Sequence, residues 1–204
     1  MKTVAASGPT TKGIDISHHQ SSVMFRDVKQ AGYEFCYMKA TEGLSMVDPL
    51  FKMRWLEAQG ANLIVGAYHY FHPGSDPIKQ AEHFCLEIGP MPSGTLPPVM
   101  DWETTDGVPN RLDLANGLSF LYKVASLTGR QPMIYTGPYF AQALQLTSIF
   151  REFPLWIAHY GVHSPLVPNP FDKWTIHQYA DHGPVPGDQN VFNGTLDDLK
   201  KFCV

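Results

Sequence analysis

The chain alternates short apolar segments with segments of helical pattern five times, and then changes to closely spaced apolar segments. The first five apolar segments are predicted strands, at residues 12–19, 33–41, 63–71, 97–103 and 133–136. Three more predicted strands, at 155–160, 174–179 and 185–192, are joined by Pro/Gly-rich loops with no room for helices. This count predicts the α/β class and a closed eight-strand, TIM-like (β/α)5(β)3 barrel that lacks its last helices.

Local signals mark the ends of several helices between these strands. Asp48 and Asp76 each precede a proline, and this pattern predicts an N-cap with Pro in the first turn. Asn110 is the predicted cap of a long helix that Gly129 closes, and Thr195 is the predicted cap of a short final helix.

Length and composition agree with one globular domain. The 204 residues suffice for one core, and 44% hydrophobic with 17% charged residues is not the composition of a disordered chain. The net charge of −4 gives no reason to expect nucleic acid or an anionic membrane as a partner, and no apolar segment is long enough to span a bilayer. We predict a flexible leader at residues 1–11, a catalytic barrel domain at 12–204, and a monomer.

An apolar run that begins at Pro97 ends in the acidic pair Asp101 and Glu103. Side chains alternate along a strand, so both acids point to one side and Trp102 to the other, with about 6.6 Å of strand between the acids. Carboxyls this close disfavour double ionisation, so one of them keeps a proton more readily. Glycoside hydrolysis needs such a pair, one acid to protonate the leaving oxygen and one to stabilise or attack the anomeric centre. Alone, the pattern is weak, because acids are common at strand ends.

Two further acids are predicted to reach the same place. Chemistry in such barrels lies at the C-terminal ends of the strands, and barrel closure puts the first strand beside the last. Asp15 lies in the first predicted strand and Asp188 in the last, so four acids are expected to meet at one mouth. The alternatives are a hydrogen-bonding role for Asp15 at a strand end and a turn position for Asp188 after Gly187.

Eight motifs occur along the chain in a fixed order: GIDISHHQ, YMKATEG, GAYHYFHPG, PPVMDWE, MIYTGPYF, LWIAHY, WTIHQYA and GDQNVFNG. Over about residues 12–202 the chain resembles glycoside hydrolase family 25, the muramidases often called Chalaropsis-type lysozymes. The resemblance implies a flattened (β/α)5(β)3 barrel. It also implies cleavage of the β-1,4 bond between N-acetylmuramic acid and N-acetylglucosamine in peptidoglycan glycan strands.

The same resemblance implies roles for individual residues. Glu103 resembles the general acid, and Asp101 the group that orients the 2-acetamido group or stabilises the oxocarbenium ion. Asp15 and Asp188 resemble the flanking acids of the groove. The aromatic and amide side chains that the resemblance places near the cleft are Tyr68, Tyr70, Trp156 and Gln178. A barrel-core position is an equal alternative for Tyr68 and Trp156, and for Tyr135 it is the favoured one.

Two other functions remain as alternatives to a glycosidase. The barrel could bind cell-wall glycan without cutting it. It could also be a metal-dependent hydrolase, for which His69 and His72 are the best-placed pair among nine histidines. No H-x-H or H-E-x-x-H pattern is present, so we predict neither a metal nor a cofactor. A chitinase-like pattern is excluded, because it requires acids at the positions of Leu96 and Val99.

The first thirteen residues, MKTVAASGPTTKG, lack the apolar core of a secretory signal peptide. A muramidase acts on the cell wall, in the periplasm or outside the cell. We therefore expect a phage endolysin or prophage product that is made in the host cytoplasm and released by lysis machinery. A secreted protein whose leader has been trimmed would look the same.

Overall fold

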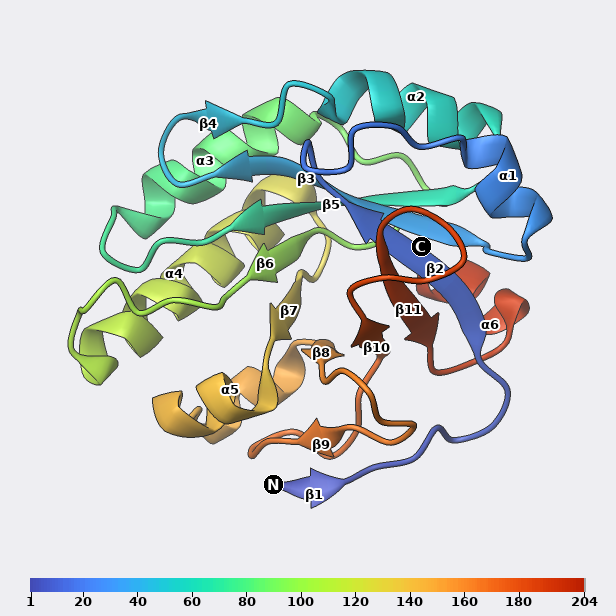
Figure 1. The fold of residues 1–204 in the computed structure, drawn as a ribbon. Coiled ribbons are helices and arrows are strands. Elements are labelled where there is room, and N and C mark those ends of the chain that lie inside the picture. Colours follow the sequence, from blue (N-terminus) through green and yellow to red (C-terminus); the bar gives the residue numbers. More distant parts are fainter. Residues whose placement is uncertain (204) are drawn as a thin grey trace.

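The computed structural model describes residues 1–203, and eight of its strands close into a barrel (Figure 1). Around the barrel the order is β2 (Thr11–Ile16), β11 (Asp188–Phe192), β10 (Ile176–Ala180), β8 (Leu155–Ala158), β7 (Met133–Thr136), β6 (Val99–Asp101), β5 (Ile64–Tyr70) and β3 (Phe35–Glu42). β3 pairs back onto β2 and closes the ring. Neighbouring strands are parallel, except that β11 runs antiparallel to both β10 and β2. The predicted (β/α)5(β)3 order is confirmed.

Helices accompany only the first part of the barrel, as the sequence predicted. They are α1 (Phe25–Gln30), α2 (Phe51–Gly60), α3 (Pro77–Ile88), α4 (Asn110–Thr128), α5 (Pro138–Leu144) and the 3-10 turn η1 (Ser148–Glu152). Figure 1 shows α1 to α5 outside the strands. The last helix, α6 (Leu196–Phe202), follows β11. None of the helices in residues 1–203 has the length and apolar character that a bilayer crossing requires.

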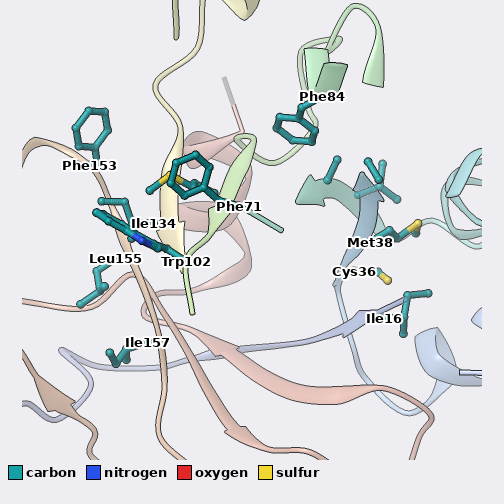
Figure 2. Close-up of a cluster of buried hydrophobic side chains, with 14 of the residues drawn as sticks. Ile16, Cys36, Met38, Phe71, Phe84, Trp102, Ile134, Phe153, Leu155 and Ile157 are labelled. Carbon is teal, nitrogen blue, oxygen red and sulfur yellow. The ribbon is translucent and has the colours of Figure 1, made fainter. Parts of the chain in front are cut away.

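Two apolar clusters hold the fold together. The outer cluster lies between strands and helices, and Figure 2 shows part of it, with Trp102, Ile134 and Leu155 close to one another. The inner cluster fills the barrel with alternate strand residues such as Phe35, Tyr37, Met133, Trp156 and Ile176. Leu199 and Cys203 of α6 belong to this inner cluster. Helix α6 therefore closes the end of the barrel at which the parallel strands begin, and the opposite end stays open.

Several helix signals in the sequence are confirmed. The Asp76 side chain accepts hydrogen bonds from the backbone N–H groups of Ile78 and Lys79 at the start of α3. Thr195 and Asp198 form a reciprocal capping box at the start of α6. Gly129 ends α4 in the left-handed conformation.

Two predicted caps are wrong. Asn110 is the first residue of α4 rather than its cap, which is Pro109. Asp48 lies before α2, whose N-cap is Leu50. Asp48 Oδ1 accepts a local hydrogen bond from the backbone N–H of Leu50 at 2.9 Å. Its Oδ2 accepts from the backbone N–H of His18 at 2.7 Å and from the His18 ring Nδ1 at 3.0 Å. The carboxylate is thus divided between a local bond ahead of α2 and a residue thirty positions away.

Residues 1–11, predicted as a flexible leader, contact the barrel in the structure. β1 (Lys2–Thr3) pairs with β9 (Leu166–Val167), and the indole Nε1 of Trp174 donates to the carbonyl of Val4 at 2.8 Å. Val4 and Ala6 pack against the outer cluster. These residues lie beside the last strands, where no helix covers the apolar surface. They pack on that surface, which the local sequence pattern does not indicate.

Packing inside the barrel leaves no room for a side chain at Gly66 on β5. A Cβ there would lie 2.4 Å from the ring of Tyr37 and 2.7 Å from Cβ of Leu96. We expect Gly66→Ala to lower the free energy of unfolding by about 1–3 kcal/mol, measured by chemical denaturation. Gly60→Ala is the control, because a Cβ at Gly60 meets nothing within 4 Å and is expected to change stability by less than about 0.5 kcal/mol. Equal effects of the two substitutions would contradict this account.

Candidate active site

A pocket of about 90 Å³ lies at the open end of the barrel. Its lining contains all four acids that the sequence predicted to converge, together with aromatic and amide side chains. The residues are Asp15, Tyr68, Asp101, Glu103, Tyr135, Trp156, Gln178 and Asp188. Asp15 and Asp188 are direct cross-strand partners on β2 and β11. The structure thus brings the two ends of the chain together at one site.

Asp101 is the last residue of β6, and Glu103 follows two residues later. Trp102, between them, points to the outer cluster, where its indole Nε1 donates to Asp113 Oδ1 at 3.0 Å. The Asp101 side chain is buried, and its Oδ1 has no hydrogen-bond partner among the described residues. Glu103 is exposed to solvent. Glu103 is therefore the acid of this pair that an incoming polymer meets first.

Both carboxyls of this pair hold protons more tightly than usual. Burial raises the pKa of Asp101 well above its ordinary value, and the charge of Glu103 adds to this effect. Burial by surrounding protein also raises the pKa of Glu103, although its hydrogen bond with Asp101 and the charge of Lys39 act in the opposite direction. Because the two carboxyls interact strongly, they act as one pair that holds a proton more tightly than an isolated carboxyl does.

Gln178 on β10 connects several of these groups. Its Nε2 donates to Asp15 Oδ2 at 2.8 Å and to Asp188 Oδ2 at 3.3 Å. Its Oε1 accepts from the hydroxyls of Tyr135 at 2.8 Å and Tyr160 at 2.9 Å. With these partners Gln178 is 1% exposed, so its main contacts in this structure are to other pocket residues.

Asp15 has a second amide donor, because Asn190 Nδ2 lies 2.7 Å from its Oδ2. Trp156 orients that amide, since its indole Nε1 donates to Asn190 Oδ1 at 2.9 Å. Trp156 is itself buried in the inner cluster, with its ring 4.8 Å from that of Tyr37 and 4.9 Å from that of Tyr135. Trp156 therefore lies both in the barrel core and at the pocket, so the two positions predicted for it as alternatives are both occupied by the same side chain.

The second pair of acids also has raised pKa values. Burial raises the pKa of Asp15 to about 8, with a further contribution from the charge of Asp188, against the hydrogen bonds of Asn190 and Gln178. Burial raises the pKa of Asp188 to about 6, helped by the charges of Asp181 and Glu103. Amide donors orient these carboxylates without supplying a positive charge, so the proton affinities stay high.

The remaining predicted residues, Tyr68 and Tyr70, lie on β5, between β3 and β6. Tyr68 is half-buried and lines the pocket. Tyr70 lies next to the pocket, in register with Asp101, and Lys39 Nζ lies 5.1 Å from its ring centroid. Lys39 also binds Glu42 Oε2 at 2.5 Å.

Sequence reasoning did not single out Tyr160, Asn190 or Lys39. Each lies within a motif that the sequence analysis quoted, LWIAHY, GDQNVFNG or YMKATEG. No local pattern distinguishes these three from other polar residues. Their positions follow from contacts across the barrel.

The histidines proposed for the metal alternative do not form a common site. His69 lies 2.7 Å from Thr41 Oγ1 through Nδ1 and 3.2 Å from Gln80 Oε1 through Nε2. His72 contacts two acids, Glu42 and Asp106. Within residues 1–203, no group of three or more His, Cys, Asp or Glu side chains is arranged to hold a metal ion.

Comparison with known proteins gives one consistent family. The model of glycosyl hydrolases family 25 matches residues 14–188. The chain is 34% identical to lysozyme M1 of Streptomyces globisporus, over 90% of this chain and 68% of that protein. It is 32% identical to the N,O-diacetylmuramidase of Chalaropsis sp, over 95% and 99%. It also resembles the crystal structure of the bacterial lysozyme from Streptomyces coelicolor, with a TM-score of 0.90, 33% identity, and 95% and 96% coverage.

The raised pKa of Asp15 makes stability depend on pH. Between the usual Asp pKa of about 4 and the value of about 8 in the fold, the folded protein holds more protons than the unfolded chain, so stability falls as pH rises. We expect Asp15→Asn to raise the melting temperature clearly at about pH 8 and little at about pH 4. The exposed Asp197→Asn serves as the control. Thermal unfolding measures the effect. If Asp15→Asn changed the melting temperature equally at both pH values, Asp15 would not have the raised pKa.

Proposed function

This chain belongs to glycosyl hydrolases family 25, and from that premise we propose that it is a lysozyme. It hydrolyses peptidoglycan at the β-1,4 bond between N-acetylmuramic acid and N-acetylglucosamine. The observation that carries this proposal is the convergence of Asp15, Asp101, Glu103 and Asp188 on one pocket at the open end of the barrel. Glycoside hydrolysis requires a pair of carboxyls, one of which keeps a proton for the leaving oxygen while the other acts at the anomeric centre.

We assign the general acid to Glu103. It is the exposed member of the coupled pair, and its pKa is raised. Its proton passes to the leaving oxygen as the glycosidic C–O bond breaks, and the bonding electrons remain on that oxygen. The resulting carboxylate then accepts a proton from the water that completes hydrolysis.

We assign to Asp101 the stabilising role behind Glu103. Its buried Oδ1 is without a protein partner in residues 1–203. It is therefore free to accept a hydrogen bond from the 2-acetamido N–H, or to face positive charge that develops at the anomeric carbon. Once the proton of the pair is on Glu103, Asp101 carries the negative charge that this role needs.

Asp15 and Asp188 are proposed to flank the reacting sugar from the other side of the pocket. Tyr68 and Tyr70 are proposed to contact the glycan directly, because both are half-buried near the opening. Trp156 and Gln178, also predicted as substrate-binding, are both 1% exposed. We propose that these two act mainly by orienting the acids, through Asn190 and directly.

Peptidoglycan glycan strands are the proposed partner, and the cell wall is the proposed site of action. The net charge of −4 gives no general attraction to an anionic polymer. Binding of the glycan is therefore proposed to depend on local contacts in the pocket. The monomeric state and the phage endolysin origin stay predictions.

Glu103→Gln tests the central assignment. The amide cannot donate the proton, so the rate of cleavage should fall by about 10²–10⁴-fold while the fold and glycan binding persist. The measurement is the release of reducing ends from purified sacculi, with sedimentation of the bound protein as the binding readout. Glu57→Gln on the exposed face of α2 is the matched control and should keep the parental rate. A Glu103→Gln variant with near-parental turnover would reject the assignment.

The two alternatives make different predictions for the same assay. A non-catalytic glycan-binding barrel releases no reducing ends at any protein concentration. A metal-dependent hydrolase loses its activity on dialysis against EDTA and recovers it with Zn²⁺. We expect steady release of reducing ends and no effect of EDTA. Loss of activity that zinc restores would favour the metalloenzyme.

A further inference from the structure

Glu103 lies beyond the end of β6, so the pairing of the barrel strands does not fix it. The segment that carries it is anchored on either side. On the near side, the backbone N–H of Trp102 donates to the carbonyl of Tyr135 at 2.9 Å, and the Trp102 indole binds Asp113. On the far side, three residues after Glu103, the anchor is Asp106. The position of the general acid therefore depends on what holds Asp106.

The Asp106 carboxylate is held by the loop that follows β5. Gly74 N–H donates to Asp106 Oδ2 at 3.1 Å, and His72 Nδ1 lies 3.1 Å from both carboxylate oxygens. Asp106 has a positive φ of 48°, a conformation that costs energy for a side chain other than glycine. Its contacts with His72 and Gly74 help to stabilise that conformation.

His72 is itself fixed by the buried Gln80 on α3. The backbone N–H of His72 donates to Gln80 Oε1 at 2.9 Å, and Gln80 Nε2 donates to the carbonyl of His72 at 2.8 Å. The second ring nitrogen, Nε2, lies 3.2 Å from Glu42 Oε1 at the end of β3. The imidazole thus lies between two carboxylates from different parts of the barrel rim. Only the protonated ring donates through both nitrogens.

We propose that protonated His72 is a positioning residue of this lysozyme, which clamps the Glu103 segment to the barrel rim through Asp106 and Glu42. The inference rests on the proposed function of Glu103. When the ring loses its proton, one of the two hydrogen bonds and both charge attractions are lost. The Glu103 segment then keeps its anchors at Trp102 and Gly74 and at most one neutral hydrogen bond to His72, so the general acid is held less firmly over the pocket.

The surroundings of His72 favour the charged form. Partial burial opposes it, but the hydrogen bonds and charges of Glu42 and Asp106 outweigh burial, so the pKa of His72 is raised above its ordinary value of about 6.5. The other facing groups are the ring of Tyr70, the buried imidazole of His69 and, behind Glu42, the ammonium of Lys39. Burial lowers the pKa of His69 to about 3, so His69 adds no charge beside His72. The clamp is therefore complete below about pH 6.5 and is lost as pH rises through the pKa of the folded protein.

His72→Gln tests the clamp through a pH profile rather than through activity at one pH. The variant cannot carry the charge, whereas the titrations of Asp101 and Glu103 are common to both proteins. We expect the ratio of wild-type to variant kcat to be about fivefold near pH 5.5 and to approach one near pH 9. His163→Gln, at an exposed loop position, is the control and should follow the wild type. A ratio that stays constant with pH would overturn the proposal.

Two further measurements separate the clamp from general damage and from the proposed function. Asp106→Asn should reproduce the His72→Gln profile, and the double variant should lose little more than either single one, because both remove the same contact. Hydrogen exchange of amides 103–108, corrected for intrinsic rates, should accelerate with pH in the wild type and be fast at all pH values in His72→Gln. A wild type without muramidase activity would reject the proposed function, and the exchange experiment would still decide the clamp.

Discussion

The pairing of β2 with both β3 and β11 is the constraint on which the site depends. It places Asp15 opposite Asp188, residues that are far apart along the chain. The direction of β11 matters equally. Because this strand is antiparallel to its neighbours, its first residue rather than its last lies at the end where the parallel strands finish. An eighth parallel strand would carry its first residue to the closed end of the barrel, beside α6.

A hydrogen-bond network then converts this closure into a defined arrangement of acids. Gln178 and Asn190 both donate to the same oxygen of Asp15, and Tyr135 on β7, two strands along from β10, donates to Gln178. These residues belong to β2, β7, β10 and β11, so the network crosses the barrel interior. Buried polar groups with satisfied hydrogen bonds specify one arrangement, because any other leaves some of them without partners. Asp101 Oδ1 is the buried carboxyl oxygen at this site that has no partner among residues 1–203, and we propose that the substrate supplies one.

Much of this could be read from the sequence, and the failures have a common cause. The eight strands and the caps at Asp76 and Thr195 rest on local patterns, and the structure contains them. Asp48 also has a local cap pattern and accepts from the backbone N–H of Leu50, but α2 starts only at Phe51 and the second carboxylate oxygen binds His18 across the chain. The attachment of residues 1–11 and the roles of Lys39 and Asn190 likewise depend on contacts between distant segments. Patterns within a short window predict elements, whereas the partners of a polar side chain are settled by the assembled barrel.

The chemistry of the donors explains how the pocket keeps its acids protonated. An arginine beside Asp15 would hold the carboxylate equally well but would lower its pKa, whereas the neutral amides of Gln178 and Asn190 leave burial as the dominant effect. Lys39 is the cation that lowers the proton affinities of Asp101 and Glu103, and its ammonium is paired with Glu42. Glu42 in turn contacts His72. The carboxylate that helps to position Glu103 therefore also offsets the positive charge of Lys39, which lowers the pKa of Glu103. Placement and protonation of the general acid therefore depend on the same few contacts between the ends of β3, β5 and β6.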